Sequence, residues 1–450
     1  MISYKRGQLG RHKDAVVLGL SLLLWSLGLG LYNFIWPAYV RQLGGTAVDY
    51  GLLVAVGMLV SSFSALPGGV WADLYDRKAV LIVGWAIALP APIIFALAPS
   101  WQWLIPGIFF YMLSTCSNPA LQAYIVHGTP PESLGTTFNL IFAAFPLGLV
   151  VSPPIGGWVA ERYGMSWVFY LAFGFYLLST LVLFWLNEQR PAADAPGVIG
   201  ASERRAAALD PRRWFKGFSR AHLDRRVVIA SAAFATALAI QNLGLPFSTP
   251  LLQDLGHLDL VTVGRLGSVA SLSAFVLSPL IGRLADRAGH GASLVLSLIV
   301  FAGSAGLLAA FPASMPMVVA SFALRGAGDG ARGLMTAAVG RSIGRAALGQ
   351  AYGVYNLLVG LFSIVTPYAG GWLYELSPTW PFWAMAGLTL LVAMPLAPLM
   401  EPVGGEPVGG EPIGGESGAA APGAGAPDSR EKPGLPAGPR EEVGHPRRTL

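Results

Sequence analysis

GVWADLYDRK, at residues 69–78, returns in altered form as GRLADRAGHG at residues 282–291, and this repeat decides the fold. The two copies lie 213 residues apart. A second pair, PPIGGW at 153–158 and PYAGGW at 367–372, is separated by 214 residues. An Asn-x-x-x-Pro sequence also recurs early in each half. Three matches in the same order indicate a chain built from two homologous halves.

The composition indicates that most of this chain does not face water. Of its 450 residues, 54% are hydrophobic and 12% are charged, whereas soluble globular proteins contain roughly 25% charged residues. The net charge of +5 does not indicate a nucleic-acid partner, because the cations stand in short stretches between apolar segments. The single cysteine, Cys116, excludes an internal disulfide and a cysteine-rich metal site. We expect no metal, no cofactor and no enzymatic activity.

Long apolar segments recur throughout residues 15–400. About 20 apolar residues in a helix cross the hydrocarbon core of a bilayer, and a helix satisfies its backbone hydrogen bonds internally there. The sequence therefore predicts an all-α membrane protein with twelve transmembrane helices, six in each half. The predicted helices cover about 15–40, 50–72, 79–98, 102–126, 136–160, 166–187, 227–253, 263–285, 292–311, 315–340, 347–374 and 380–400.

Five regions follow from this pattern. Residues 1–14 form an N-terminal segment, 15–187 and 227–400 are the two six-helix halves, and 188–226 is a basic linker. Part of the linker mixes tryptophan and phenylalanine with cations, which favours an interfacial helix. Residues 401–450 are rich in glycine and proline, and we expect them to be disordered. The first apolar segment is too long for a signal peptide, so we expect it to be retained.

The distribution of cations predicts the orientation. If both termini are cytoplasmic, the loops on that side and the linker carry 19 Lys and Arg residues, against 3 in the opposite loops. Positive residues accumulate on the cytoplasmic side of membrane proteins. The sequence therefore predicts that both termini face the cytoplasm.

The repeated loop stretch resembles the loop signature of the major facilitator superfamily, and the resemblance covers residues 15–400. It implies a multi-pass transporter of the cytoplasmic membrane, monomeric, with a gate at each signature loop. Physically, glycines in these loops would let helices approach closely, and the aspartates would cap a facing helix or pair with an arginine. The candidate gating residues are Gly69, Asp73, Arg77, Gly282, Asp286 and Arg287. A solvated turn with scattered charge is the alternative.

The Pro-x-x-Gly-Gly pattern of the fifth predicted helix resembles the antiporter signature of the same family, where glycine and proline bend a helix beside the cavity. Because the pattern also occurs in the eleventh helix, a structural packing role explains it equally. The candidate bend residues are Pro153, Gly156, Gly157, Pro367, Gly370 and Gly371.

Three charges interrupt the tenth predicted helix. Arg325 and Arg332 stand four residues before and three residues after Asp329, so all three share one helix face. Asp329 falls near the middle of the span, where a charge must face a cavity or a partner. Three functions remain open: a proton-coupling carboxylate, an arginine that binds an anionic substrate group, or an internal ion pair that joins helices.

Polar and aromatic residues in the first, fourth and seventh predicted helices are candidates for the cavity lining. Each could equally form a hydrogen bond between helices. Such a lining suits a hydrophobic or neutral solute better than a dianion. The candidates are Asn33, Trp36, Asn118, Gln122, Tyr124, Gln241 and Asn242.

These observations favour a secondary transporter that works by alternating access on a substrate near the midplane. No ATP-binding loop occurs in the sequence, so we expect an ion gradient, protons above all, to drive uphill transport. Export of small amphipathic compounds is the first hypothesis, and import of a sugar or organic acid is the second. A membrane receptor without transport is an alternative of another class.

Overall fold

Helices form wherever the sequence is apolar and end where it supplies a cap or a proline. The computed structural model describes residues 2–129, 133–189, 210, 225–341 and 348–400. These residues contain helices and no strand, and Met1–Gly404 forms one compact unit. Most of the predicted linker and the whole predicted tail lie outside the described residues.

The first half of the chain contains nine α-helices, counted over the described residues. Short 3-10 turns join some of them, as at Ser114–Ser117 between α6 and α7. The helices are α1 (Ile2–Asn33), α2 (Trp36–Gln42), α3 (Ala47–Leu74), α4 (Arg77–Ala88), α5 (Pro90–Leu97), α6 (Leu104–Leu113), α7 (Asn118–Gly128), α8 (Leu134–Tyr163) and α9 (Met165–Val182).

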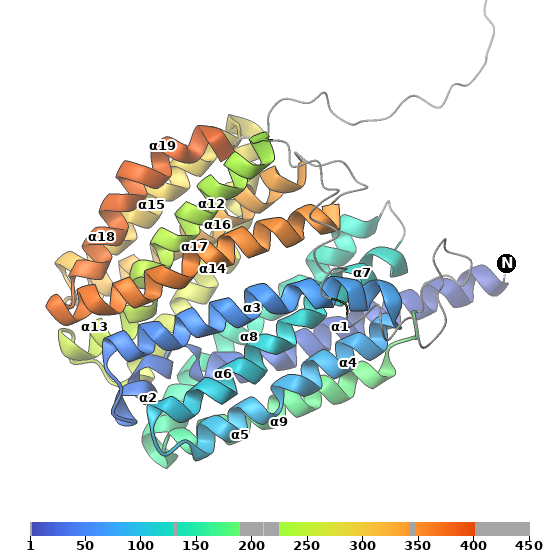
Figure 1. Cartoon of the computed structure of the whole chain (residues 1–450), viewed down its shortest axis with the longest axis horizontal. Coiled ribbons are helices and arrows are strands. Elements are labelled where there is room, and N and C mark those ends of the chain that lie inside the picture. The colour runs from blue at the N-terminus through green and yellow to red at the C-terminus, as the bar shows by residue number, and fades with distance from the viewer. Residues whose placement is uncertain (1, 130–132, 190–209, 211–224, 342–347, 401–450) are drawn as a thin grey trace, which may run out of the picture. The chain divides into compact units, whose positions relative to one another are not determined.

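The second half of the chain contains a corresponding series of α-helices. A π-helical turn, Thr389–Ala393, separates its last two α-helices. The helices are α12 (Arg225–Gly244), α13 (Ser248–Asp254), α14 (Leu260–Ala288), α15 (His290–Ala310), α16 (Met315–Arg341), α17 (Leu348–Leu376), α18 (Trp380–Leu388) and α19 (Met394–Leu396). Figure 1 shows the two sets side by side, with α3 next to α17.

Eight described helices are long and apolar enough to cross a membrane, and each overlaps a predicted span. The other four predicted spans fall on α6–α7, α12–α13, α16 and α17, which are helical but interrupted, charged or only partly described. The 3-10 turn, for example, divides α6 from α7. The total of twelve transmembrane helices therefore stays a prediction.

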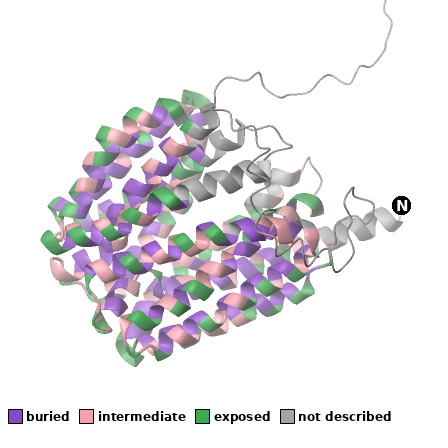
Figure 2. Ribbon diagram, viewed as in Figure 1, coloured by how far each residue is buried: buried purple, intermediate pink, exposed green. Residues whose placement is uncertain are grey.

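Burial separates an inner protein core from an outer apolar surface. In the first half, the Trp25 and Tyr176 rings stack with centroids 4.5 Å apart, and the Tyr176 hydroxyl lies 2.7 Å from that of Tyr32. Large apolar side chains such as Leu391 and Val365 are exposed instead, at 77% and 65%. Figure 2 shows exposed and buried positions alternating along the helices. So much exposed apolar surface would be unfavourable in water and fits contact with lipid.

Besides a smaller contact of α2 with α13, the halves meet through two helix pairs, α3 with α17 and α8 with α14. Both contacts involve a glycine against a proline-containing turn. A Cβ on Gly51 would collide with the Pro367 carbonyl, and a Cβ on Gly264 would collide with the Pro153 carbonyl. Since 264 is 213 positions after 51, and 367 is 214 after 153, the two contacts are equivalent under the internal repeat.

The helix ends define two ends of this bundle. The connections at 43–46, 255–259 and 377–379 lie at one end, here called the Arg41 end. The connections at 75–76 and 289, which belong to the repeated signature, lie at the other, here called the motif end. The glycine contacts near Gly51 and Gly264 are close to the Arg41 end of their helices.

Candidate functional site

Two of the three charges of α16, Asp329 and Arg332, form an ion pair in the structure. The Asp329 Oδ1 atom lies 3.4 Å from Arg332 Nη1, and the two side chains are 43% and 46% exposed. Arg332 Nη2 also donates a hydrogen bond of 3.1 Å to Oε1 of Gln241 on α12. Gln241 itself is 2% exposed. The pair is therefore accessible from one side and held to α12 on the other.

Arg325 is placed differently from the pair. Its Nη1 atom donates a hydrogen bond of 3.3 Å to Ser248 Oγ on α13, and its guanidinium lies 5.6 Å from the centre of the Phe322 ring. Both contacts lie within the second half of the chain. Arg325 thus links α16 to α13, while Arg332 links α16 to α12.

The predicted cavity residues divide into exposed and packed groups. Asn33, Asn118 and Gln122 are exposed, and Asn242 is half-buried. Trp36 packs its ring against Phe95, with centroids 4.5 Å apart, inside the first half. It is therefore partly buried and packs against the core in this conformation.

Tyr124 also has a packing role in this conformation. It is 2% exposed, and its hydroxyl lies 3.0 Å from Asp14 Oδ2 and 2.9 Å from the Asn187 carbonyl. These contacts join the start of the first half to its end.

At the motif end, the described contacts of Asp76 and Arg77 stay within the first half and the first residues of the linker. Asp76 Oδ1 accepts hydrogen bonds from the backbone N–H of Lys78, at 3.2 Å, and of Gln189, at 2.9 Å. Arg77 is 7% exposed, and its Nη2 lies 3.5 Å from His127 Nε2. Asp76 therefore caps α4, and Asp73, the residue named by the signature, lies in the last turn of α3 with its side chain outside the described part.

Gly69 and Gly282 make no close helix approach among the described residues, so the gating role of these glycines stays a prediction. Among the described residues, nothing lies within 4 Å of the position that a Cβ would occupy at either glycine. The neighbouring Gly68 is the packed one, because a Cβ there would collide with the Cys116 carbonyl. One residue rotates the position by about 100° around a helix, which is enough to move it off the contact. In the second copy, Asp286 and Arg287 are both exposed.

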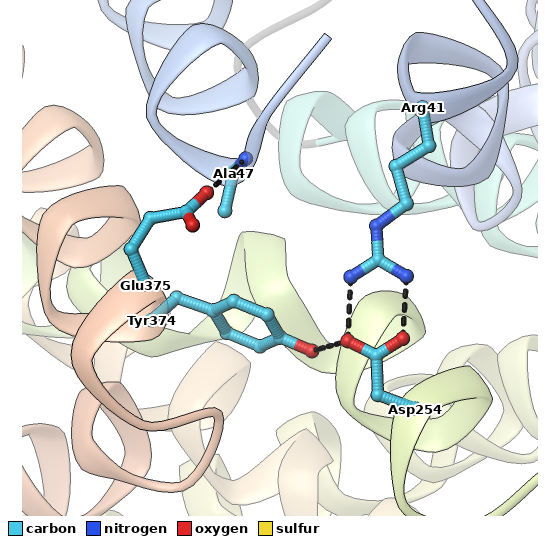
Figure 3. A network of polar contacts seen from close by, with 5 residues as sticks. All are labelled: Arg41, Ala47, Asp254, Tyr374 and Glu375. Atoms are coloured by element: carbon cyan, nitrogen blue, oxygen red, sulfur yellow. Dashed lines mark hydrogen bonds and ion pairs between the residues drawn. The ribbon is translucent and has the colours of Figure 1, made fainter. Parts of the chain in front are cut away.

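At the Arg41 end, polar side chains join the two halves. Arg41 Nη1 and Nη2 each donate a 2.6 Å hydrogen bond to one oxygen of Asp254, and the Tyr374 hydroxyl donates another of 2.6 Å to Oδ2. Figure 3 shows this arrangement with Glu375, whose Oε1 accepts a 3.0 Å hydrogen bond from the Ala47 N–H. A bidentate arginine–carboxylate pair has the strongest geometry available to such charges.

The pair changes the titration of both partners. Burial alone would raise the pKa of Asp254, but the hydrogen bonds from Arg41 and Tyr374 and the charge of Arg41 outweigh it and lower this pKa. The hydrogen bonds to Asp254 also raise the pKa of Arg41. Both side chains are 33% exposed, so water screens part of this attraction.

The candidate bend glycines are contact points between helices. Gly156 and Gly370 pack within their own halves, against the Leu31 and Leu243 carbonyls. Gly157 packs across the halves, against Leu260, and Gly371 does so against Ala47. Pro153 and Pro367 lie inside α8 and α17.

Sequence reasoning missed the residues that join the halves at the Arg41 end. A signal for two of them was present, because the repeated Gly-Gly-Trp sequence continues to a glutamate three residues later, at Glu161 and Glu375. The Arg41–Asp254 pair had no such signal. Its members are chemically different and separated by 213 residues.

Comparisons with known proteins agree with this architecture. A family model, Major Facilitator Superfamily, matches residues 18–264 and again residues 229–417. The chain is 26% identical over 298 residues to the multidrug resistance protein MdtG of Serratia proteamaculans, covering 64% of this chain and 69% of that protein. It is 22% identical over 279 residues to an uncharacterised MFS-type transporter of Methanocaldococcus jannaschii, covering 62% of this chain and 70% of the relative.

Solved structures share the fold at low sequence identity. The nucleoside transporter NupG, as a D323A mutant, superposes with a TM-score of 0.68 at 14% identity, over 86% of this chain and 99% of that one. The human organic anion transporter MFSD10 (TETRAN) gives 0.64 at 17% identity, over 86% of this chain and 99% of that one. With the family match over both halves, these results show that the chain is a multi-pass membrane transporter that belongs to the major facilitator superfamily.

Proposed function

We propose that this protein is a proton-coupled exporter of small amphipathic compounds that works by alternating access. The observation that carries the proposal is the Asp329–Arg332 pair, a carboxylate and a guanidinium 3.4 Å apart and both nearly half exposed within α16. A carboxylate with access to water can exchange a proton, and intramembrane carboxylates serve as proton relays in transporters. The multidrug resistance names of the MdtG relatives support export.

The proposal includes a topology. Twelve helices in two halves place both termini and the basic linker in the cytoplasm, supported by the cation excess of 19 over 3. The motif end then faces the cytoplasm and the Arg41 end faces outward. The protein works as a monomer, with each half moving against the other. Reporter fusions after Met400 that gave an external signal would contradict this topology.

Substrate binding through an arginine is the alternative for the same helix. Arg325 is the better candidate, since its guanidinium is bound to Ser248 and stands over Phe322. An anionic group could take the place of a hydroxyl partner there.

The test is transport by the Asp329→Asn variant in proteoliposomes with an imposed pH gradient. The amide keeps the size of the side chain and one hydrogen-bond acceptor but cannot titrate. We expect gradient-driven transport to be lost while substrate binding and downhill exchange remain. Wild-type pH dependence in a well-folded variant would exclude the coupling role.

One further variant and one further measurement on Asp329→Asn separate the alternatives. Arg325→Gln should raise the apparent KM for anionic compounds selectively if that arginine binds substrate. If the α16 charges only join helices, Asp329→Asn should instead lower expression and the melting temperature, because it leaves Arg332 without its carboxylate.

A further inference from the structure

Two glutamates reach from one half of the protein to a helix N-terminus of the other half. Glu375, near the end of α17, accepts a 3.0 Å hydrogen bond from the N–H of Ala47, the first residue of α3. Glu161, near the end of α8, accepts hydrogen bonds of 2.7 and 3.3 Å from the N–H groups of Leu260 and Val261, the first residues of α14. A carboxylate is favourable there because the helix N-terminus carries unpaired N–H groups and a partial positive charge.

The two contacts are equivalent under the internal repeat. Glu375 lies 214 positions after Glu161, and Leu260 lies 213 positions after Ala47. Each is accompanied by a glycine that brings the same helices together, Gly371 against α3 and Gly157 against α14. A contact that recurs in both copies, with the glycine and the carboxylate at the same spacing, is a property of the architecture.

The Arg41–Asp254 pair lies at the centre of this arrangement. Its two residues are themselves 213 positions apart, so they occupy equivalent places in the two halves. Equivalent positions can contact each other only on the symmetry axis that relates the halves. The Arg41 end is therefore joined on its axis by an ion pair and on either side by one glutamate.

The two contacts are built so that they can open. Glu161 and Glu375 are exposed, and each helix N-terminus keeps a cap of its own. Thr46 and Asp49 form a capping box on α3, and Asp259 accepts a 2.8 Å hydrogen bond from the Thr262 N–H on α14. Separation of the halves would expose the freed N–H groups to water and would not bury them, so opening has a modest cost.

We propose that Glu161 and Glu375 are paired gating residues, which hold the Arg41 end closed by capping α14 and α3 and release these helices when the transporter opens at that end. The inference rests on the proposed alternating access, since a gate has a function only if the halves separate. The inference names Glu161 and Glu375 as the residues that set the equilibrium between the closed and open states of the Arg41 end.

The test measures the separation of the halves directly. Spin labels at Gln42 in the first half and Thr379 in the second, in a Cys116→Ser background, report the distance across the Arg41 end by electron–electron double resonance. We expect Glu161→Ala and Glu375→Ala each to shift the ratio of closed to open protein roughly fivefold toward open. The double variant should shift it roughly twenty-fivefold if the two contacts are independent. Glu→Gln variants should give smaller shifts, because the amide oxygen still accepts a hydrogen bond.

Matched controls lie at the same two helix ends. Asp49→Asn and Asp259→Asn remove a carboxylate that caps its own helix and whose described hydrogen bonds stay in its own half, so they should leave the distance distribution unchanged. Equal shifts in the controls and the glutamate variants, or no shift in the double variant at an unchanged melting temperature, would overturn the proposal. The distances are measured without substrate or gradient, so an absence of proton-coupled export would not affect them.

Discussion

The two ends of the helix bundle differ in how they join the halves. At the Arg41 end, a bidentate ion pair, two carboxylate caps and close glycine contacts connect the first half to the second. At the motif end, the described contacts of Asp76 and Arg77 run to Lys78 and His127 in the first half and to Gln189 just after it, and none of them reaches the second half. The structure is therefore closed at the Arg41 end.

The comparison teaches that a sequence signature and an observed contact can belong to different conformations. The repeated stretch that identifies the family lies at the motif end, where no described residue comes within 4 Å of a Cβ placed on Gly69 or Gly282. A gate at that end would be assembled in the opposite state, when the Arg41 end opens. The glutamates that join the halves in the present state, Glu161 and Glu375, belong to a less obvious repeat. The only signal for them is a glutamate three residues after each Gly-Gly-Trp sequence.

The largest expected difference between the two ends comes from adding one methyl group. At the Arg41 end, a Cβ on Gly157 or Gly371 would collide with the backbone of the facing helix, and overpacking of this kind costs ~1–3 kcal/mol. We expect Gly157→Ala and Gly371→Ala to lower the melting temperature or to populate the open state. Thermal unfolding in detergent and the distance between labels at Gln42 and Thr379 measure both.

Gly69→Ala and Gly282→Ala are the matched changes at the motif end. Alanine favours a helix over glycine by roughly 1 kcal/mol, and space is available for it. These variants should be as stable as the wild type or slightly more stable. If the alanine variants at both ends were destabilised equally, the two ends would not differ in how closely their helices pack.

A smaller effect is expected from the ion pair. Arg41→Gln leaves Asp254 with Tyr374 as its remaining donor, and a partly exposed pair contributes at most ~1 kcal/mol. The variant should open the Arg41 end slightly. The charge exchange, Arg41→Asp with Asp254→Arg, should restore closure because it forms the ion pair again. Closure should be restored only in part, since Tyr374 then lacks its carboxylate acceptor. A double variant no better than the single one would show that the pair contributes nothing.

The same pair predicts a pH dependence. The pKa of Asp254 is below its ordinary value of 3.8, so the closed end gains stability from this carboxylate at any pH above that value. The gain should be lost as the pH falls below about 4, while closure between pH 5 and 7 should not change through Asp254. Distance measurements across this pH range distinguish the contribution of Asp254 from that of groups that titrate near neutral pH.

The smallest effect on stability is expected at the motif end. Asp286 is exposed, so Asp286→Asn should change the melting temperature very little. If Asp286 holds the motif end closed in the opposite state, Asp286→Asn should still lower the transport rate. That state would then lose one stabilising contact, and the equilibrium between the two states would shift. Asp73→Asn is the equivalent change in the first half. Wild-type turnover in both variants would mean that these aspartates do not gate.

Much of the architecture could be predicted because it depends on composition and periodicity. Apolar segments predicted the positions of the helices, and the repeat at 213 or 214 residues predicted two halves. The signature loops in that repeat predicted the family, and the family match confirmed the family. The side-chain contacts could not be read in the same way. Whether Gly68 or Gly69 meets its neighbour depends on a rotation of the helix by about 100°, which neither the repeat nor the composition determines.

The polar candidates show the same limit. Gln241 was a candidate for the cavity lining, and in the structure it accepts a hydrogen bond from Arg332 on α16. Trp36 and Tyr124 looked equally suitable in the sequence but are packed inside the first half. An amphipathic residue in an apolar segment can face either a cavity or another helix, and only the packing of the neighbouring helices decides between them.

The position of the Arg41–Asp254 pair on the axis has a consequence for how such a chain can arise. An ancestor assembled from two identical six-helix copies would place the same residue at both positions, arginine against arginine or aspartate against aspartate. Like charges in direct contact would repel and hold that end apart. An attractive pair at this point requires two copies that can mutate separately, so this ion pair became possible only after duplication had given the copies independent sequences.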